Sequence, residues 1–388
     1  MGAATVRLLK GADRVLGRTL YRFFLHRRKR HSRPGEGILP DPVTSILVIR
    51  PGGIGDAVLV FPLLGALRAA FPKARLEVLA ERRNVGLFAA NSVVDRAWAY
   101  DRRLGGELAE VLRRRYDLVV DTEQYHFLSA IVTWLTGAPV RAGFDTQGRG
   151  GLFTHRVRYS DQVYEVRSFL SLARELTGRE VPFDQERPFF PVAEEHLAWA
   201  RGLLGRAPGG SESRAAPQPV AVVSPGASMP QRRWDPERYR QLVHWLTEQG
   251  MRVVVIGGAG DVPTARRVVA GFDPARVVSI AGDASLARTA AVIALADLYV
   301  SSDTGPLHIA YGVGTPTVHL FGSGILEKWA PASLRYQAVH KALPCSPCTR
   351  YGYTPPCPYD VECMRRIVVD DVIARAREII TGPRTPET

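Results

Sequence analysis

Long apolar runs are absent from this 388-residue sequence, and no stretch approaches the roughly 20 apolar residues that a membrane-spanning helix needs. Residues 1–30 also lack the uninterrupted apolar core and the small-residue cleavage site of a secretory signal. Cysteine is scarce, and all four cysteines fall in one cluster near the C-terminus. We therefore expect neither a spanning helix nor a secretory signal, and the composition is compatible with the cytoplasm.

Acidic residues are outnumbered, with 38 Asp and Glu against 51 Lys and Arg, which gives a net charge of +13. Residues 1–38 hold ten basic and two acidic side chains, a net +8, so the other 350 residues are close to neutral. This distribution excludes a protein whose whole surface is strongly basic. The length favours two or three domains, and 46% hydrophobic residues argue against wholesale disorder.

The basic N-terminal segment, residues 1–38, has the pattern of an amphipathic helix. One flank would carry Arg7, Lys10, Arg14, Arg18 and Arg22. The other flank would carry Val6, Leu8, Leu9, Val15, Leu16, Leu20, Phe23 and Phe24, with Asp13 as its one charge. Residues 6–33 suit an anionic membrane surface, although a helix packed on its own domain fits as well. Nucleic-acid binding is the weakest interpretation, because no aromatic-interleaved module follows.

Short apolar, β-branched segments alternate with helical patterns in two series, which predicts parallel sheets covered on both faces. The first series is 45–50, 75–80, 117–121 and 139–144, with helices such as 59–70 and 107–115 between. The second is 220–224, 252–257, 277–281, 297–301 and 317–321. We expect two doubly wound α/β domains, 39–203 and 220–388, with a cleft between them. The Gly-, Pro- and Ser-rich residues 204–219 would form an exposed linker.

In such sheets ligands bind beyond the carboxyl ends of the strands. After the first strand comes Arg50-Pro51-Gly52-Gly53-Ile54-Gly55-Asp56, and a helix follows directly. The glycines Gly52, Gly53 and Gly55 allow close approach of a ligand to the backbone. The loop matches neither a dinucleotide fingerprint nor a P-loop. Asp56 is also a residue type that caps helices, and its position alone favours that role.

Two loops of the second series carry groups that suit a diphosphate and a ribose. The loop after 220–224 contains Ser228, Arg232 and Arg233. Arginine offers fixed donors to phosphate oxygens, although solvated surface arginines would look the same. Asp261, after the next strand, would accept from a ribose hydroxyl or cap the following helix.

The stretch Ser301-Ser302-Asp303-Thr304-Gly305-Pro306-Leu307-His308 is the most informative. A strand ends there, and a small polar turn leads into a helix. The N–H groups at that helix start, with Thr304 and Gly305 beside them, would form an anion cradle. Asp303 would cap the helix rather than bind phosphate. His308 lies one turn inside and faces either the cleft or the core.

Three segments together resemble glycosyltransferase family 9, the ADP-heptose:lipopolysaccharide heptosyltransferases. They are IRPGGIGDAVLVFPLLGALRAAFP, SPGAS with the following RRW, and SSDTGPLHIAYGVGTPTVHLFG. The resemblance runs from about residue 45 to residue 371. It implies a GT-B fold, with two Rossmann-like domains facing across a cleft, the acceptor bound mainly by the first and the nucleotide sugar by the second. It also implies inversion at the anomeric carbon.

Carried over residue by residue, the resemblance implies that Asp56 is the catalytic base. Arg232 stands where many members have a phosphate-binding Lys, and Ser228 matches a hydroxyl that contacts phosphate. Asp261 falls near a ribose-binding Glu. The donor-site residues that match directly are Asp303, Thr304, Gly305 and His308.

This chemistry needs a base for the acceptor hydroxyl and stabilisation of the departing diphosphate. Asp56 would supply the first. Arg232, Ser228 and the helix start after Asp303 would supply the second. No DxD-like acidic pair is placed for a divalent ion, so we expect no metal requirement in catalysis.

The cysteine cluster is Cys345-x2-Cys348-x8-Cys357-x5-Cys363. This spacing leaves open a structural zinc or iron–sulfur site, two disulfides or bare thiols, and favours a structural over a catalytic role.

The favoured interpretation is an enzyme that moves heptose from ADP-heptose to a lipopolysaccharide-core glycolipid. We expect it to act at the inner face of the cytoplasmic membrane, without nucleic-acid partners. The alternatives are a GT-B-fold transferase or epimerase that uses another nucleotide sugar, and a catalytically silent nucleotide-sugar-binding protein.

Overall fold

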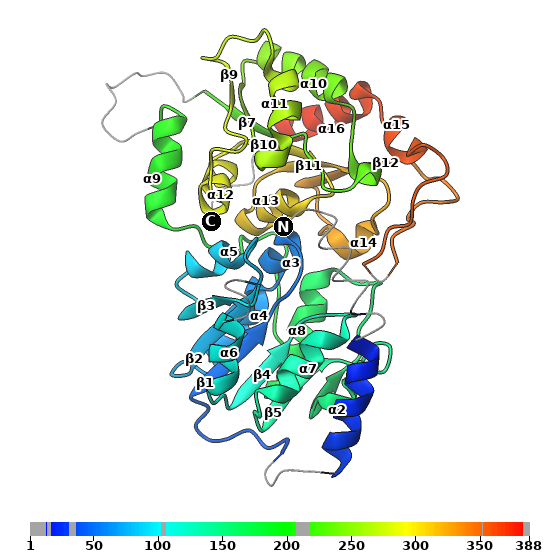
Figure 1. Cartoon of the computed structure of the whole chain (residues 1–388). Helices are drawn as coiled ribbons and strands as arrows, with labels where there is room; N and C mark the ends of the chain where they lie inside the picture. The colour runs from blue at the N-terminus through cyan, green and yellow to red at the C-terminus, as the bar shows by residue number, and fades with distance from the viewer. Residues whose placement is uncertain are drawn as a thin grey trace. The chain divides into compact units, whose positions relative to one another are not determined.

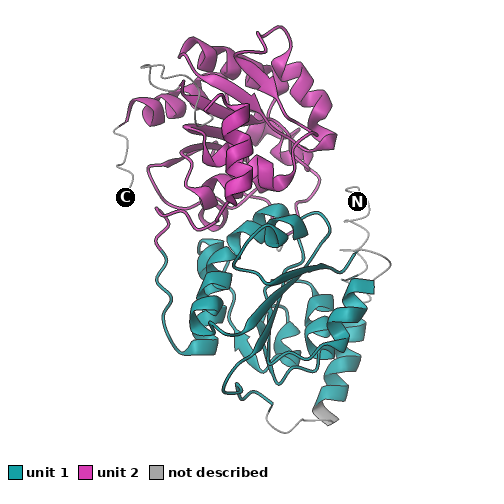
Figure 2. Ribbon diagram, turned by 90° about the vertical axis from the view of Figure 1, so that its left-hand side faces the viewer, with its two compact units in different colours: residues 1–183 teal, residues 184–388 magenta. Residues whose placement is uncertain are grey.

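The computed structural model describes residue 13 and residues 17–30, 36–101, 106–206, 218–350 and 352–382. The chain divides into two compact units, unit 1 (Met1–Phe183) and unit 2 (Asp184–Thr388), coloured separately in Figure 2. Each unit contains one six-stranded sheet in which all neighbouring strands are parallel. Of the helices described, none has both the length and the apolar character to cross a membrane.

The sheet of unit 1 has the strand order β3-β2-β1-β4-β5-β6 (Figure 1). Its strands are β1 (Ser45–Ile49), β2 (Arg75–Ala80), β3 (Arg96–Ala99), β4 (Leu118–Asp121), β5 (Val140–Phe144) and β6 (His155–Val157). Its α-helices are α2 (Arg18–Arg30), α3 (Ile54–Leu59), α4 (Phe61–Ala70), α5 (Val85–Ala89), α6 (Gly106–Arg113), α7 (Phe127–Leu135) and α8 (Glu165–Thr177), and a 3-10 helix, η3, covers Arg149–Leu152.

The central strands of unit 1 are apolar without alternation because helices cover both faces of the sheet. All five residues of β1 are buried, and so are all four of β4. On one face Leu47, Trp98 and Val119 form a core with Val111 of α6. The sheet is thereby a rigid platform for the loops at its strand ends.

The sheet of unit 2 has the order β12-β11-β10-β7-β8-β9. Its strands are β7 (Val220–Ser224), β8 (Arg252–Val255), β9 (Val277–Ser279), β10 (Leu298–Ser302), β11 (Thr317–Phe321) and β12 (Tyr336–His340). Its α-helices are α9 (Glu194–Leu203), α10 (Pro236–Glu248), α11 (Val262–Val269), α12 (Leu286–Ala294), α13 (Gly305–Val313), α14 (Leu326–Trp329), α15 (Glu362–Arg365) and α16 (Val369–Thr381). Two 3-10 helices, η4 (Pro230–Arg232) and η5 (Ala259–Asp261), lie in its loops.

The core of unit 2 extends beneath the loop that follows β7. Trp234 is almost fully buried, and its indole N–H donates to the Ile367 carbonyl over 2.8 Å. Trp234 also stacks edge-on against Tyr239 of α10, with ring centroids 4.8 Å apart. These contacts fix the end of the loop that carries Arg232.

All nine strands expected from the sequence are present, with small differences at their ends. The three strands that the sequence did not predict are β3, β6 and β12, and each lies at the edge of a sheet. They contain polar and charged residues, as in the RAWA of β3. An edge strand has one open side, so it lacks the unbroken apolar run of a central strand.

The boundary between the units lies after Phe183, ahead of the expected boundary at residue 203. The reason is local packing in unit 2. Helix α9 packs against α12, and the N–H groups of Phe189 and Phe190 both donate to the Gly312 carbonyl. Of the predicted linker 204–219, residues 207–217 lie outside the described part.

The N-terminal helix α2 is a packed part of unit 1 and lies beside α7 (Figure 1). Tyr21 is buried, and its hydroxyl donates to the Arg149 carbonyl over 2.7 Å. The alternative that this helix packs on its own domain is therefore confirmed for α2. Residues 1–12, 14–16 and 31–35, which include Arg7, Lys10 and Arg14, lie outside the described residues.

Candidate functional site

The glycine loop of unit 1 runs from the end of β1 into α3. Gly52 has a φ of +113°, a left-handed conformation that residues with a Cβ rarely adopt. A Cβ at this position would lie 3.1 Å from an Arg50 guanidinium nitrogen. Gly53 is the N-cap residue of α3, and Gly55 is buried in its first turn. Gly52 thus makes the tight turn from strand to helix, and the approach of a ligand to these glycines stays a prediction.

Side chains from the end of β2 hold this loop in place. The Gly52 N–H donates to Glu81 Oε1 over 2.9 Å, and the Asn84 side-chain amide donates to the Gly52 carbonyl over 3.1 Å. The Tyr100 hydroxyl donates to the same Glu81 oxygen over 2.8 Å. The loop is therefore fixed by a set of polar contacts before any substrate arrives.

Asp56 lies in the first turn of α3 and is partly exposed. Its Oδ2 accepts from the Gly53 N–H over 3.3 Å, the contact expected of a residue at a helix start. This bond orients the carboxylate. Asp56 is thus both helix-start acceptor and accessible carboxylate, so the capping and catalytic interpretations are compatible.

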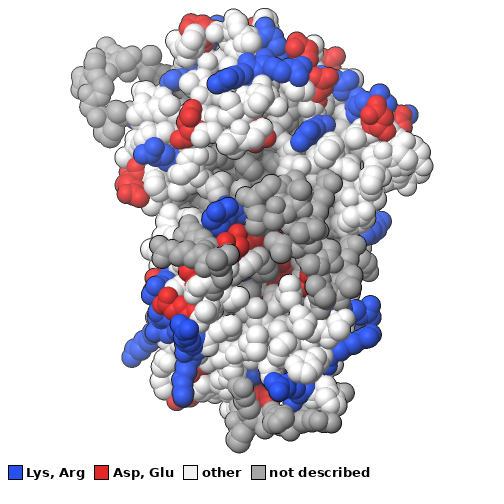
Figure 3. Space-filling model, in the orientation of Figure 1, with Lys and Arg blue, Asp and Glu red and all other residues white. Residues whose placement is uncertain are grey.

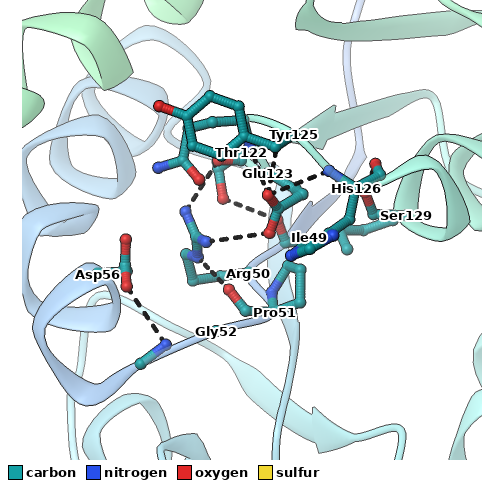
Figure 4. Close-up of polar contacts among 12 residues, drawn as sticks. Ile49, Arg50, Pro51, Gly52, Asp56, Thr122, Glu123, Tyr125, His126 and Ser129 are labelled. Carbon is teal, nitrogen blue, oxygen red and sulfur yellow. Dashed lines mark hydrogen bonds and ion pairs between the residues drawn. The ribbon is translucent and has the colours of Figure 1, made fainter. Parts of the chain in front are cut away.

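Arg50 is buried beside Asp56, and Figure 4 shows its guanidinium between Asp56 and Glu123. It donates to the Pro51 carbonyl over 2.6 Å and to the Thr122 carbonyl over 2.8 Å. Its distance to Glu123 Oε2 is 3.6 Å. The loop at the end of β1 is thereby tied to the loop at the end of β4.

Burial alone would raise the pKa of Glu123, but the charges of His126, Arg50 and Arg149 outweigh it and hold this pKa below its ordinary value. Glu123 also accepts from the backbone N–H groups of Gln124 and Tyr125. Glu123 is thus an ionised counter-charge to Arg50.

In unit 2 the predicted donor residues Arg232 and Asp303 are in direct contact. A terminal guanidinium nitrogen of Arg232 lies 3.2 Å from Asp303 Oδ2 and 3.1 Å from the Asp303 carbonyl oxygen. Asp303 is buried, and a Cβ at Gly324 would lie 2.3 Å from its Oδ2. Asp303 therefore fixes Arg232 at the end of β10.

Helix α13 starts directly after this pair, with Thr304 as the N-cap residue and Gly305 as its first residue. Thr304 Oγ1 and Arg232 Nε are buried, and neither has a hydrogen-bond partner in the described part of the chain. Because a helix N-terminus presents N–H donors to an anion, the arrangement suits a phosphate group. His308 is buried, with its ring centroid 5.8 Å from those of Tyr311 and Trp329.

Asp261 ends η5, and its Oδ2 accepts from the Gly258 N–H over 2.9 Å, whereas its side chain makes no capping hydrogen bond to the following helix α11. It also packs against the loop after β7, since a Cβ at Gly226 would lie 2.3 Å from Asp261. Ser228 is exposed in that same loop. Asp261 thus lies beside the predicted phosphate loop, and the ribose role stays a prediction.

The four cysteines follow β12, and no disulfide joins them. Burial raises the pKa of Cys348, and the nearby Cys357 and Cys345 raise it further. Across the described residues, no group of three or more His, Cys, Asp or Glu side chains is arranged to hold a metal ion. A Cβ at Gly322 would lie 2.9 Å from Cys363 Sγ, so the cluster packs on the end of β11.

The sequence interpretation missed the buried residues that support the glycine loop, namely Glu81, Asn84 and Glu123. The signal was present, because Glu81 directly follows β2 and Glu123 lies two residues after β4. The rule that sites lie at the carboxyl ends of strands covers both positions.

Comparisons with known proteins identify the family. The family model described as "Glycosyltransferase family 9 (heptosyltransferase)" matches residues 106–357. Lipopolysaccharide heptosyltransferase 2 of Escherichia coli K12 is 26% identical over 316 residues, which are 76% of this chain and 87% of that protein.

Two solved structures have the same fold. The ADP-heptose LPS heptosyltransferase II of E. coli gives a TM-score of 0.67 at 23% identity and covers 87% of this chain and 98% of its own. A family 9 glycosyltransferase from Veillonella parvula gives 0.70 at 18% identity, with 88% and 98% covered. The fold is GT-B, with two Rossmann-like α/β domains. On the family match, this chain belongs to glycosyltransferase family 9, the heptosyltransferases.

Proposed function

We propose that this protein transfers heptose from ADP-heptose to a lipopolysaccharide-core glycolipid, with inversion at the anomeric carbon. The observation that carries the proposal is the Arg232–Asp303 pair at the start of α13, in a chain of this family. A solved relative, the E. coli heptosyltransferase WaaC, was determined with ADP-2-deoxy-2-fluoro heptose and gives a TM-score of 0.64. That ligand of the relative supports an ADP-linked donor here.

In this proposal unit 2 binds the donor. Arg232 and the N–H groups at the start of α13 stabilise the negative charge that grows on the departing diphosphate. Asp303 accepts from Arg232 and holds its guanidinium in place, while Thr304 and Ser228 offer hydroxyl donors. Asp261 accepts a hydrogen bond from a ribose hydroxyl through Oδ1, because its Oδ2 already binds the Gly258 N–H.

Unit 1 supplies the base. Asp56 removes the proton of the attacking acceptor hydroxyl as the new bond to the anomeric carbon forms and the bond to the diphosphate breaks. The glycine loop allows the acceptor to approach the backbone beside Asp56. Inversion follows from this single displacement, because attack and departure take place on opposite faces of the sugar.

A glycolipid acceptor is confined to a membrane, so we place the reaction at the inner face of the cytoplasmic membrane. The net charge of +8 on residues 1–38 supports a peripheral, electrostatic association with anionic lipid.

The test is donor selection followed by product analysis. Bound ligand raises thermal stability by mass action, so ADP-heptose should raise the melting temperature more than GDP- or UDP-sugars. NMR of the product should then show the anomeric configuration opposite to that of the donor. Stabilisation by a GDP- or UDP-sugar instead would favour another transferase, and donor binding without transfer would favour a binding protein.

A further inference from the structure

Helix α2 has a buried side and an exposed side, and both carry apolar residues. Tyr21 is buried and Phe24 and Leu25 are partly buried against unit 1. Leu20 and Phe23 are 45% and 54% exposed. Packing on unit 1 therefore does not account for all the apolar residues of this helix.

Contacts of Tyr21 and Arg28 hold α2 in one orientation, and Asp13 is held on unit 1 ahead of the helix. Asp13 is buried, and its carboxylate accepts from the backbone N–H groups of Phe127 and Leu128 at the start of α7. Arg28, near the other end, donates to the Phe153 carbonyl over 2.9 Å and lies 3.2 Å from Glu36. With the Tyr21 hydroxyl bond, these contacts set which side of α2 faces outward.

The exposed apolar side of α2 continues onto α7. Phe24 joins the two helices, with its ring centroid 5.3 Å from that of Trp134. At about 100° per residue, Leu20 and Phe23 stand on the flank of α2 nearest Phe24. On α7, Leu128 and Leu135 are 41% and 42% exposed and lie two turns apart on one face. Leu20, Phe23, Leu128 and Leu135 form what we call the α2–α7 ridge.

The charged side chains of α2 and α7 themselves have one sign. Arg18, Arg22 and Arg27 of α2 are exposed, and the Arg27 guanidinium lies 5.3 Å from the Phe23 ring centroid. The sequences of α2 and α7 contain no acidic residue. Figure 3 shows Lys and Arg side chains beside uncharged surface in the region of α2, at the lower right. An apolar ridge with a basic border complements a layer of anionic headgroups over acyl chains.

We propose that the α2–α7 ridge docks unit 1 on an anionic lipid membrane. The four apolar side chains enter the boundary between headgroups and acyl chains, and the three arginines bind the headgroups. The inference rests on the proposed function, because a membrane glycolipid acceptor requires unit 1, which carries Asp56, to lie at the bilayer. It extends the surface from the N-terminal segment to α7, more than 100 residues away in the sequence.

The test is co-sedimentation of the full-length protein with vesicles of phosphatidylcholine and phosphatidylglycerol, and with vesicles of phosphatidylcholine alone. Wild type should bind the anionic vesicles and release them as salt rises. Leu20→Ser/Phe23→Ser and Leu128→Ser/Leu135→Ser should each weaken partition roughly tenfold. The control Leu334→Ser/Ile380→Ser removes two exposed apolar side chains from unit 2 and should change nothing.

The α7 variant decides the matter, because a tether made by the basic segment alone would leave its partition at the wild-type level and overturn the proposal. Absence of wild-type binding would overturn it too. Self-association of wild type that the ridge variants abolish, without vesicle binding, would assign the ridge to a second copy.

Donor binding and transfer, measured apart from membrane binding, show whether the proposed function itself fails. Each ridge variant should keep the wild-type thermal shift with ADP-heptose and the wild-type transfer rate to a water-soluble acceptor fragment. A wild type that partitions through the ridge but transfers no heptose would contradict the function and leave the ridge intact. Loss of the thermal shift in a ridge variant would instead mean that the variant is misfolded, and single substitutions at Leu128 and Leu135 then replace it.

Discussion

The glycine loop of unit 1 and the donor loops of unit 2 both lie at the carboxyl ends of parallel strands, but their polar groups are paired differently. In unit 1 the loop is held by Glu81 and Asn84, and Arg50 donates to two carbonyls and pairs with Glu123. In unit 2, Arg232 Nε and Thr304 Oγ1 are buried without partners among the described residues. Buried donors are costly when unpaired, so the second arrangement suits a site whose ligand completes the hydrogen bonds.

The two sites therefore differ in what holds their functional groups in place. The protein itself positions the carboxylate of Asp56 in unit 1. In unit 2 it provides donors for an anion and holds Arg232 through Asp303. Substitutions in unit 2 should therefore change donor binding, and those in unit 1 should change the transfer step.

After substitution of the base Asp56, the largest effect is expected for Arg232→Ala. Loss of the guanidinium removes a donor to the departing diphosphate, so kcat/KM should fall about 10²–10³-fold and donor affinity should fall with it. Titration with ADP-heptose and steady-state kinetics measure both. The control Arg233→Ala removes the neighbouring arginine, which donates to the Ala227 carbonyl, and should have a far smaller effect. Equal losses in the two variants would contradict the assignment.

A smaller effect is expected for Gly52→Ala. A left-handed φ at a residue with a Cβ costs about 1–2 kcal/mol, and the new Cβ would press on Arg50. The loop should shift, and kcat should fall roughly tenfold while donor affinity stays unchanged. The matched control is Gly65→Ala in α4, where nothing lies within 4 Å of the new Cβ. It should stabilise the fold by about 0.5–1 kcal/mol without loss of activity.

Glu81→Ala tests whether the support beneath the glycine loop contributes to turnover. Two donors, the Gly52 N–H and the Tyr100 hydroxyl, would lose their acceptor, which should cost about 1–3 kcal/mol of unfolding free energy. We expect kcat to fall severalfold and Glu81→Gln to restore part of it. Glu175→Ala, an exposed glutamate of the same unit, is the control. A fall in donor affinity would contradict the claim that substitutions in unit 1 change only the transfer step.

The smallest effect on activity is expected for Asp13→Asn. Burial would raise the pKa of Asp13, but hydrogen bonds from His126, Leu128 and Phe127 outweigh it and keep the pKa below 3.8. Such a group stabilises the fold above its unfolded pKa and loses that contribution as pH falls through its folded pKa. Denaturant unfolding should show wild type about 1 kcal/mol more stable at pH 7. This difference should shrink below about pH 4. A difference that is independent of pH would exclude an ionised Asp13.

The fold could be predicted from the sequence wherever burial is complete. The interior strands β1, β4, β7, β10 and β11 are fully buried and mostly apolar, and all were expected. The edge strand β12, with the sequence YQAVH, was missed because one of its sides is open. The expected helix 59–70 begins at Phe61, with a proline in its first turn, and α3 precedes it.

The sequence predicted the site residues that lie at strand ends. It did not predict the residues that contact them. The position of Asp303 at the end of β10 follows from the motif, whereas its ion pair with Arg232 depends on how two loops distant in sequence meet. Likewise Asp56 was found from its loop, while Glu81 and Asn84 come from another strand end. Such partners are set by tertiary packing, to which a single sequence gives only weak clues.

The most direct test of the division between the units is Asp56→Asn measured beside Arg232→Ala. We predict that Asp56→Asn lowers transfer about 10²–10⁴-fold and binds ADP-heptose as wild type does, since only the base is removed. Asp41→Asn, an exposed aspartate of unit 1, is the control and should transfer normally. Transfer at the wild-type rate by Asp56→Asn, or loss of donor binding in it equal to that of Arg232→Ala, would contradict the account.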